Sequence, residues 1–196
     1  MSKHLIFIRH GETDWNKQGL IQGWKDIPLN DAGIKQAKAW AAKLKEMRVE
    51  FVFSSDLARA RQTAVILSDA LNIPVSYSHL LRERCYGAAE GMTRAQMMET
   101  YADIIRQMKD ESNPDRHKIA LPGGESKENI FQRTMHFIHE VSETTDQDTL
   151  LFCTHGEIIN TFIKKNFGIH ERFDPAEGAY VLYDVKNKTF SDYKKL

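Results

Sequence analysis

The chain has 196 residues, of which 27 are basic and 27 acidic, so its formal net charge is zero. This length favours a single domain that buries a full hydrophobic core without disulfides or metals. The balanced charge argues against a nucleic-acid-binding protein, which is usually basic. No apolar run approaches the ~20 residues of a membrane span. Two cysteines and no apolar leader favour a cytoplasmic protein.

The first predicted element is a strand at residues 4–9, HLIFIR, where apolar residues follow one another without polar alternation. That pattern is typical of a strand buried on both faces of a sheet. A helix is predicted over residues 31–46, because apolar residues recur there at helical spacing. Either Asn30 or Asp31 can cap that helix.

A second short strand is predicted at residues 51–55, FVFSS, and a helix at 57–71. A short strand at 74–78 follows. Residues 88–124 have the weakest pattern, with one helical run and a polar stretch. We interpret them as a small helical lobe inserted over the sheet, not as a separate domain.

A long helix is predicted at residues 125–143, a buried strand at 149–155 and a helix at 157–168 that Gly168 ends. The tail, 179–193, reads as a hairpin around a KNK turn. Alternating strands and helices predict an α/β three-layer sandwich with a mainly parallel central sheet and helices on both faces. We expect one domain over residues 1–196, with an inserted cap at about 88–124.

Basic and hydroxyl side chains follow or end three of these predicted strands. In open α/β sheets, ligands bind at the carboxyl ends of the strands. The groups that would meet there are Arg9-His10-Gly11, Ser54-Ser55 with Arg59, and Thr154-His155-Gly156. Two arginines and one or two imidazoles form a site for an anion, and the arginine fork suits phosphate. We expect Gly11 to let the backbone turn close to that phosphate.

A neutral imidazole can attack phosphorus, which makes His10 a candidate nucleophile. No metal is required, because arginines can supply the charge, and the histidines lack metal-ligand spacing. The chain has no Walker loop, and Cys153 is not followed by C-x₅-R, which argues against an NTPase and a cysteine phosphatase. The leaving oxygen needs an acid. From the residues alone, Glu83 and Glu90 both remain candidates.

These motifs resemble the histidine phosphatase superfamily, also called phosphoglycerate mutase-like, in the family's order along the chain. The matching stretches are LIFIRHGETDWN, GLIQGWKDIPLNDAGIKQA, FSSDLARARQTA, LRERCYGAAEG, PGGES and CTHGEIIN. The resemblance implies that His10 is the phosphorylated nucleophile and that Arg9, Arg59 and His155 hold the phosphoryl group. It also implies that Glu83, and not Glu90, is the proton donor.

The resemblance also implies a set of residues that bind the phosphate and the substrate. Asn16, Gln22 and Gly23 fall where the family contacts them, and Arg94 falls where the mutases place a substrate-binding lysine. The predicted binding set is Asn16, Gln22, Gly23, Arg84, Tyr86, Arg94 and Gly156. We expect a small phosphorylated metabolite as the ligand, and no metal, cofactor, membrane or nucleic-acid partner. A homodimer remains an open alternative.

Two departures favour the phosphatase branch over the mutases. The segment YADIIRQMKDES lacks the adjacent arginine pair of the mutases, and HGEIINT stands where they favour HGNSLR. The pairing of LRERCYGAAEG with LPGGES looks more like the branch of broad-specificity sugar-phosphate phosphatases and fructose-2,6-bisphosphatase relatives, and α-ribazole phosphatases share many of these features. The main hypothesis is therefore a phosphomonoester hydrolase, and the alternatives are a cofactor-dependent phosphoglycerate mutase and a non-catalytic phosphate-binding relative.

Substrate specificity is expected to lie in residues 84–124. Several cations there could contact an anion, and we favour Arg84 and Arg94 for that role. The other basic residues are interpreted as solvated surface charges: Arg106, Lys109 and Arg116.

Overall fold

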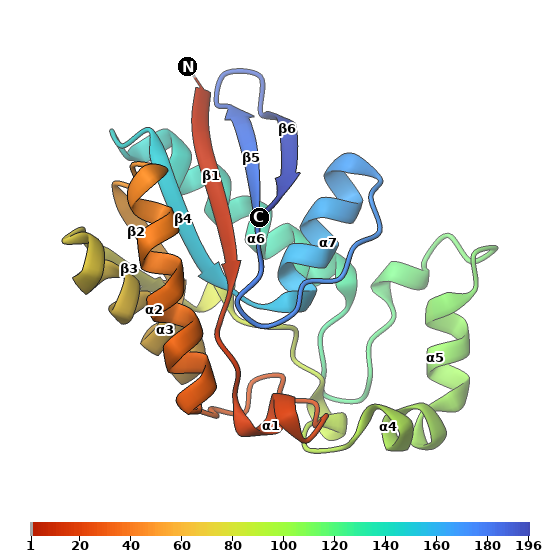
Figure 1. Cartoon of the computed structure of the whole chain (residues 1–196). Helices are drawn as coiled ribbons and strands as arrows, with labels where there is room; N and C mark the ends of the chain where they lie inside the picture. Colours follow the sequence, from red (N-terminus) through yellow and green to blue (C-terminus); the bar gives the residue numbers. More distant parts are fainter. Residues whose placement is uncertain (1) are drawn as a thin grey trace.

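The computed structural model describes residues 2–196, and a six-stranded sheet runs through the middle of this part of the chain (Figure 1). The strand order is β3-β2-β4-β1-β5-β6. The strands are β1 (Ser2–Arg9), β2 (Phe51–Ser55), β3 (Val75–Ser78), β4 (Thr149–Thr154), β5 (Gly178–Asp184) and β6 (Thr189–Lys195). The first four pair in parallel, and β5 joins β1 and β6 antiparallel. The predicted fold class, with its terminal hairpin, is confirmed.

Residues 2–196 contain seven α-helices and three 3₁₀ turns. The helices are α1 (Asp14–Lys17), α2 (Asp31–Glu46), α3 (Ala58–Leu71), α4 (Arg94–Thr100), α5 (Ala102–Lys109), α6 (Lys127–Thr144) and α7 (Gly156–Phe167). The 3₁₀ turns are η1 (His79–Leu81), η2 (Gly87–Ala89) and η3 (Arg116–Lys118). In the described part of the chain, no helix combines the length and apolarity that a bilayer crossing requires.

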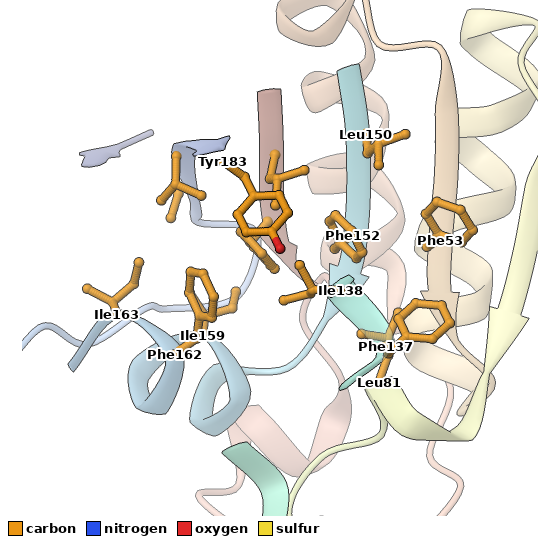
Figure 2. Close-up of a cluster of buried hydrophobic side chains, with 14 of the residues drawn as sticks. Phe53, Leu81, Phe137, Ile138, Leu150, Phe152, Ile159, Phe162, Ile163 and Tyr183 are labelled. Atoms are coloured by element: carbon orange, nitrogen blue, oxygen red, sulfur yellow. The ribbon is translucent and has the colours of Figure 1, made fainter. Parts of the chain in front are cut away.

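Successive residues of β1 point to opposite faces of the sheet, and each face has its own hydrophobic core. Leu5 and Phe7 belong to a core that includes residues of α6 and α7. Figure 2 shows part of this core, with Phe152 of β4 close to the aromatic ring of Phe137. Ile6 and Ile8 belong to the other core, with residues of α2 and α3. The unbroken apolar run of the first strand therefore serves two helical layers, as predicted.

The residues expected to form the cap extend away from the sheet. Helices α4 and α5 contain no buried residue and lie beyond the edge of the central layers in Figure 1. A capping box between Thr93 and Gln96 begins α4. Both helices still contribute side chains to a cavity at the carboxyl edge of the sheet. One outer wall of the cavity is therefore formed by helices without buried residues.

Candidate active site

A cavity of about 410 Å³ lies at the carboxyl edge of the sheet. Because β1 and β4 are neighbours in register, with Arg9 opposite Thr154, the residues that follow both strands meet there. The predicted site residues that line the cavity are Arg9, His10, Asn16, Gln22, Gly23, Arg59, Glu83, Arg84, Tyr86, Arg94 and Gly156. Among the predicted residues, only His155 is outside the lining. The topology thus brings together segments that are far apart in the sequence.

His10 follows the last residue of β1 and is only 2 % exposed. Its ring Nδ1 lies 2.7 Å from the carbonyl oxygen of Gly11, and Arg59 Nε donates to its Nε2 at 3.2 Å. An arginine N–H can only donate, so Nε2 must be the acceptor and Nδ1 carries the proton. Burial, then the charges of Arg59 and Arg9, hold the pKa of His10 well below its ordinary 6.5. The ring is therefore neutral, with its lone pair on Nε2.

Arg59, in the first turn of α3, is 1 % exposed. Besides contacting His10, its guanidinium donates to the carbonyl oxygens of Gly23 at 2.7 Å and Lys25 at 2.9 Å. Burial lowers its pKa from 12.5 to about 10. No carboxylate of the described residues forms an ion pair with it within 4.0 Å. A buried cation in this state is suited to an anionic ligand.

Arg9, the last residue of β1, presents a second guanidinium. Its Nη1 donates to the carbonyl oxygen of Phe173 at 2.6 Å, while its buried Nε has no partner within residues 2–196. Burial lowers the pKa of Arg9, and the nearby Glu83 carboxylate acts in the opposite direction. A Cβ on Gly156 would lie 3.4 Å from this guanidinium, in van der Waals contact, so Gly156 packs close to Arg9.

His155, which follows β4, is fully buried. Its ring lies edge-on to that of His10, with centroids 5.2 Å apart, and its Nε2 is 2.8 Å from Ser55 Oγ. Burial and the charge of Arg59 hold its pKa well below 6.5. The second histidine therefore lies behind the first, and Ser55 at the end of β2 fixes its ring.

Glu83 lies in the loop after η1, half-buried at the cavity wall. Its Oε1 accepts from the backbone nitrogen of Arg84 at 2.8 Å, and its Oε2 faces the nitrogen of Glu157 at 3.4 Å. Burial is the main cause that raises its pKa above 4.5, and the charge of Glu157 adds to it. Glu90, the other candidate, accepts instead from the nitrogens of Trp24 and Tyr86. It holds two loops together and does not line the cavity.

An ion pair outside the cavity supports the loop that carries Glu83. Arg133 of α6 contacts both carboxylate oxygens of Glu125 at 3.0 Å. The same guanidinium donates to the carbonyl oxygens of Leu80 at 2.6 Å and Glu83 at 3.0 Å. Glu125 also accepts from the nitrogen of Cys85 at 2.9 Å. The loop is therefore held on both sides of its acid.

The other predicted binding residues differ in how many of their side-chain groups already have a partner within the protein. Asn16 uses its side-chain oxygen to cap α1, so its amide nitrogen is the group left for a ligand. Arg84 is nearly buried, donates to the carbonyl oxygen of Glu125 and lies over the ring of Tyr86. Arg94 is at the start of α4. Gly23 has φ +50°, and a Cβ there would clash with Glu90.

The structure adds detail to two sequence-based expectations, for Gly11 and Lys109. Gly11 has no positive φ, and its added Cβ would lie 2.5 Å from the carbonyl oxygen of Gly33, so the glycine is needed for backbone packing against α2. Lys109 is exposed, as expected of a solvated surface charge, and it also lines the cavity. Sequence reasoning also missed several lining residues, because no motif marks them: Leu20, Ile21, Met97, Met98, Ile105, Lys127, Glu157, Asn160, Arg172 and Phe173.

The arrangement combines a neutral imidazole, two guanidinium groups and a carboxyl whose pKa is raised. Such a set can attack a phosphoryl group, stabilise its negative oxygens and protonate a leaving oxygen. Within residues 2–196, no three His, Cys, Asp or Glu side chains are grouped as metal ligands.

A family model described as the histidine phosphatase superfamily (branch 1) matches residues 5–179. The phosphatase PhoE of Bacillus subtilis, itself described as uncharacterised, is 32 % identical over 84 % of this chain and 77 % of its own. A 2,3-bisphosphoglycerate-dependent phosphoglycerate mutase of Lactiplantibacillus plantarum is 31 % identical over 94 % of both chains. A mycobacterial glucosyl-3-phosphoglycerate phosphatase, solved with VO3, superposes with a TM-score of 0.80 at 25 % identity, over 91 % of this chain and 92 % of its own. Phosphatases and mutases thus both occur among the relatives, and this chain belongs to the histidine phosphatase superfamily.

Proposed function

We propose that the protein is a metal-independent phosphomonoester hydrolase that acts on a small phosphorylated metabolite through a phosphohistidine intermediate. The observation that carries this proposal is the state of His10: a neutral ring with the lone pair of Nε2 next to the guanidinium of Arg59. A phosphoryl group in front of Nε2 would lie in the cavity that Arg9 also lines. Nucleophile and charge stabilisation then coincide at one point.

The reaction has two steps. In the first, His10 Nε2 forms a bond to phosphorus as the phosphorus–oxygen bond to the alcohol breaks, and protonated Glu83 gives its proton to the departing oxygen. In the second, Glu83 takes a proton from water, the water oxygen attacks phosphorus, and the bond to His10 breaks. The raised pKa of Glu83 favours its protonated form before the first step. His155 lies behind His10, where it would limit the movement of the ring.

Burst labelling tests the covalent step. Protein is mixed with a ³²P-labelled phosphomonoester, quenched in alkali, which preserves phosphohistidine, and counted after denaturation. The wild type should retain label, and His10→Ala should lose both label and turnover. His4→Ala is the matched control, because His4 is exposed on the same strand and contacts Tyr180. Near-normal turnover of His10→Ala would overturn the assignment.

Mutase activity is the second candidate, because a mutase relative aligns over 94 % of the chain. A mutase returns the phosphoryl group from histidine to the substrate instead of to water. The discriminating assay compares phosphate release from phosphoglycerates with the interconversion of 3- and 2-phosphoglycerate, with and without 2,3-bisphosphoglycerate. We expect release to dominate, because the chain lacks the adjacent arginine pair of the mutases. Interconversion faster than release would identify the mutase.

A further inference from the structure

A second cavity, of about 360 Å³, lies between α7, the η3 turn and the beginning of α6. It adjoins the candidate active site, since three residues line both cavities: Lys127, Glu157 and Asn160. Lys127 Nζ and Glu157 Oε1 form an ion pair at 2.9 Å in this shared wall. A ligand in the second cavity would therefore be separated from the catalytic cavity by these three shared residues.

Positive charge is concentrated in this second cavity. Its walls include Lys127, Lys164 and Lys165, and Arg116 lies near enough to affect their surroundings. Burial and then the charges of Lys165, Arg116, Lys164 and Lys127 lower the pKa of His117, which also lines the cavity. Four cations thus act on one imidazole.

The negative groups of the walls do not neutralise all of this charge. Glu157 pairs with Lys127, and Glu128, which does not line the cavity, pairs with Lys165 at 3.0 Å. Lys164 is half-buried and forms no ion pair with another described residue. Glu171 is the remaining acidic side chain of the lining, and its buried Oε2 has no hydrogen-bond partner among the described residues. The ammonium of Lys164 is therefore the cation that is available to a ligand.

A buried hydroxyl in the same lining also lacks a partner. Thr161 is 6 % exposed, and its Oγ1 has no hydrogen-bond partner in the described part of the chain. Thr161 and Lys164 are three residues apart on α7, so they lie on neighbouring positions of one helical face. A buried hydroxyl normally finds a partner. An oxyanion beside Lys164 could accept its hydrogen bond.

We propose that the second cavity is a binding site for a phosphate or carboxylate group, with Lys164 as its principal ligand and Thr161 as a second donor. The anion is either the distal group of a substrate whose phosphoryl group lies at His10, which rests on the proposed function, or a free inorganic anion. Positive charge of this kind in a concave wall raises the local concentration of anions. In the first case, the substrate carries two anionic groups.

The kinetic test compares substrates with one and two anionic groups. Hydrolysis of p-nitrophenyl phosphate is measured beside a series of alkanediol bisphosphates of increasing length. Lys164→Gln should lower kcat/KM for the bisphosphates that reach the second cavity about tenfold, the loss typical of one charge-assisted hydrogen bond. It should leave p-nitrophenyl phosphate within about twofold. Lys164→Arg should recover most of the loss, and Lys186→Gln, an exposed lysine in the β5–β6 turn, is the control.

A binding test covers a free anion and does not need turnover. Inorganic phosphate is titrated calorimetrically into the wild type, where we expect two binding sites, and into Lys164→Gln, where we expect one. Loss of the second site without a change for the bisphosphates identifies a free anion. Loss for the bisphosphates identifies a substrate group. If Lys164→Gln changes neither kcat/KM for the bisphosphates nor the number of phosphate sites, the proposal is wrong. A wild type that hydrolyses no substrate but keeps two phosphate sites would refute only the proposed function.

Discussion

Replacing Arg59 by methionine separates catalysis from stability. The side chain is buried, makes no ion pair with a described carboxylate and donates to two loop carbonyl oxygens besides His10. Methionine fills much of the same volume without charge. If the role of Arg59 is to bind the phosphoryl group, its replacement should abolish most activity and leave the fold intact.

The expected change in stability follows from two opposing contributions. The pKa of Arg59 falls from 12.5 to about 10, which corresponds to about 3 kcal/mol against its charged form. At pH 7 arginine is charged in both the folded and the unfolded chain, so the folded state carries this cost in full. The two hydrogen bonds to Gly23 and Lys25 contribute about 1.5 kcal/mol each in the other direction. We therefore expect Arg59→Met to change the free energy of unfolding by less than about 1 kcal/mol.

Catalysis should respond very differently, because the developing charge on the phosphoryl group loses one fixed donor. A loss of 10²–10³ in kcat/KM, or about 3–4 kcal/mol, is typical of such a donor. Urea unfolding and p-nitrophenyl phosphate hydrolysis measure the two quantities. Arg61→Met, an exposed position on the same helix, is the control and should affect neither. A destabilisation above about 3 kcal/mol would refute the reasoning, since Arg59 would then be part of the scaffold.

Three further predictions concern pH, packing and the supporting ion pair. The pH profile of kcat/KM should be bell-shaped. Protonation of His10, whose pKa is lowered, gives the acid limb, with its midpoint below 6.5. Deprotonation of Glu83, whose pKa is raised, gives the alkaline limb, and Glu83→Gln should remove that limb. An acid limb centred above 6.5 would contradict the neutral ring. Gly11→Ala forces a Cβ to within 2.5 Å of the Gly33 carbonyl oxygen, and chemical denaturation should show a loss of about 1–3 kcal/mol; an unchanged midpoint would show that the backbone yields there. Arg133→Gln frees the loop that carries Glu83, so kcat should fall with little change in KM, and an altered alkaline limb would distinguish this from simple destabilisation.

The sheet and the chemistry of its edge could be predicted from the sequence because both depend on local pattern. Unbroken apolar runs marked β1 and β4, and the residues after them carried the His–Gly pairs. Parallel strands necessarily end at one edge, so His10 and His155 could be placed together without a structure. The same kind of local rule limited the cap of α2 to Asn30 or Asp31, and the structure shows that Asn30 is the cap.

Features that depend on contacts across the fold could not be predicted. Helix α1 has only four residues, too few for a hydrophobic period. The clash that requires Gly11 comes from Gly33, and nothing in either residue's neighbours indicates the approach. Lys127 and Glu157 belong to different helices, so their pairing in a shared wall is a tertiary property. The sequence likewise does not reveal that His10 lines the cavity while His155 lies behind it.

The parallel pairing of β1 with β4 has a consequence for the time at which activity arises. His10 N donates to the carbonyl oxygen of Thr154 at 3.0 Å, so the two histidines are brought together by strands that are far apart in the sequence, β1 and β4. Such non-local pairing is slow, because the entropy of closing a long loop is lost before any contact stabilises the pair. A nascent chain that ends before residue 149 holds His10 but neither His155 nor β4. If the proposed activity is correct, its recovery during refolding would therefore time the pairing of β1 with β4.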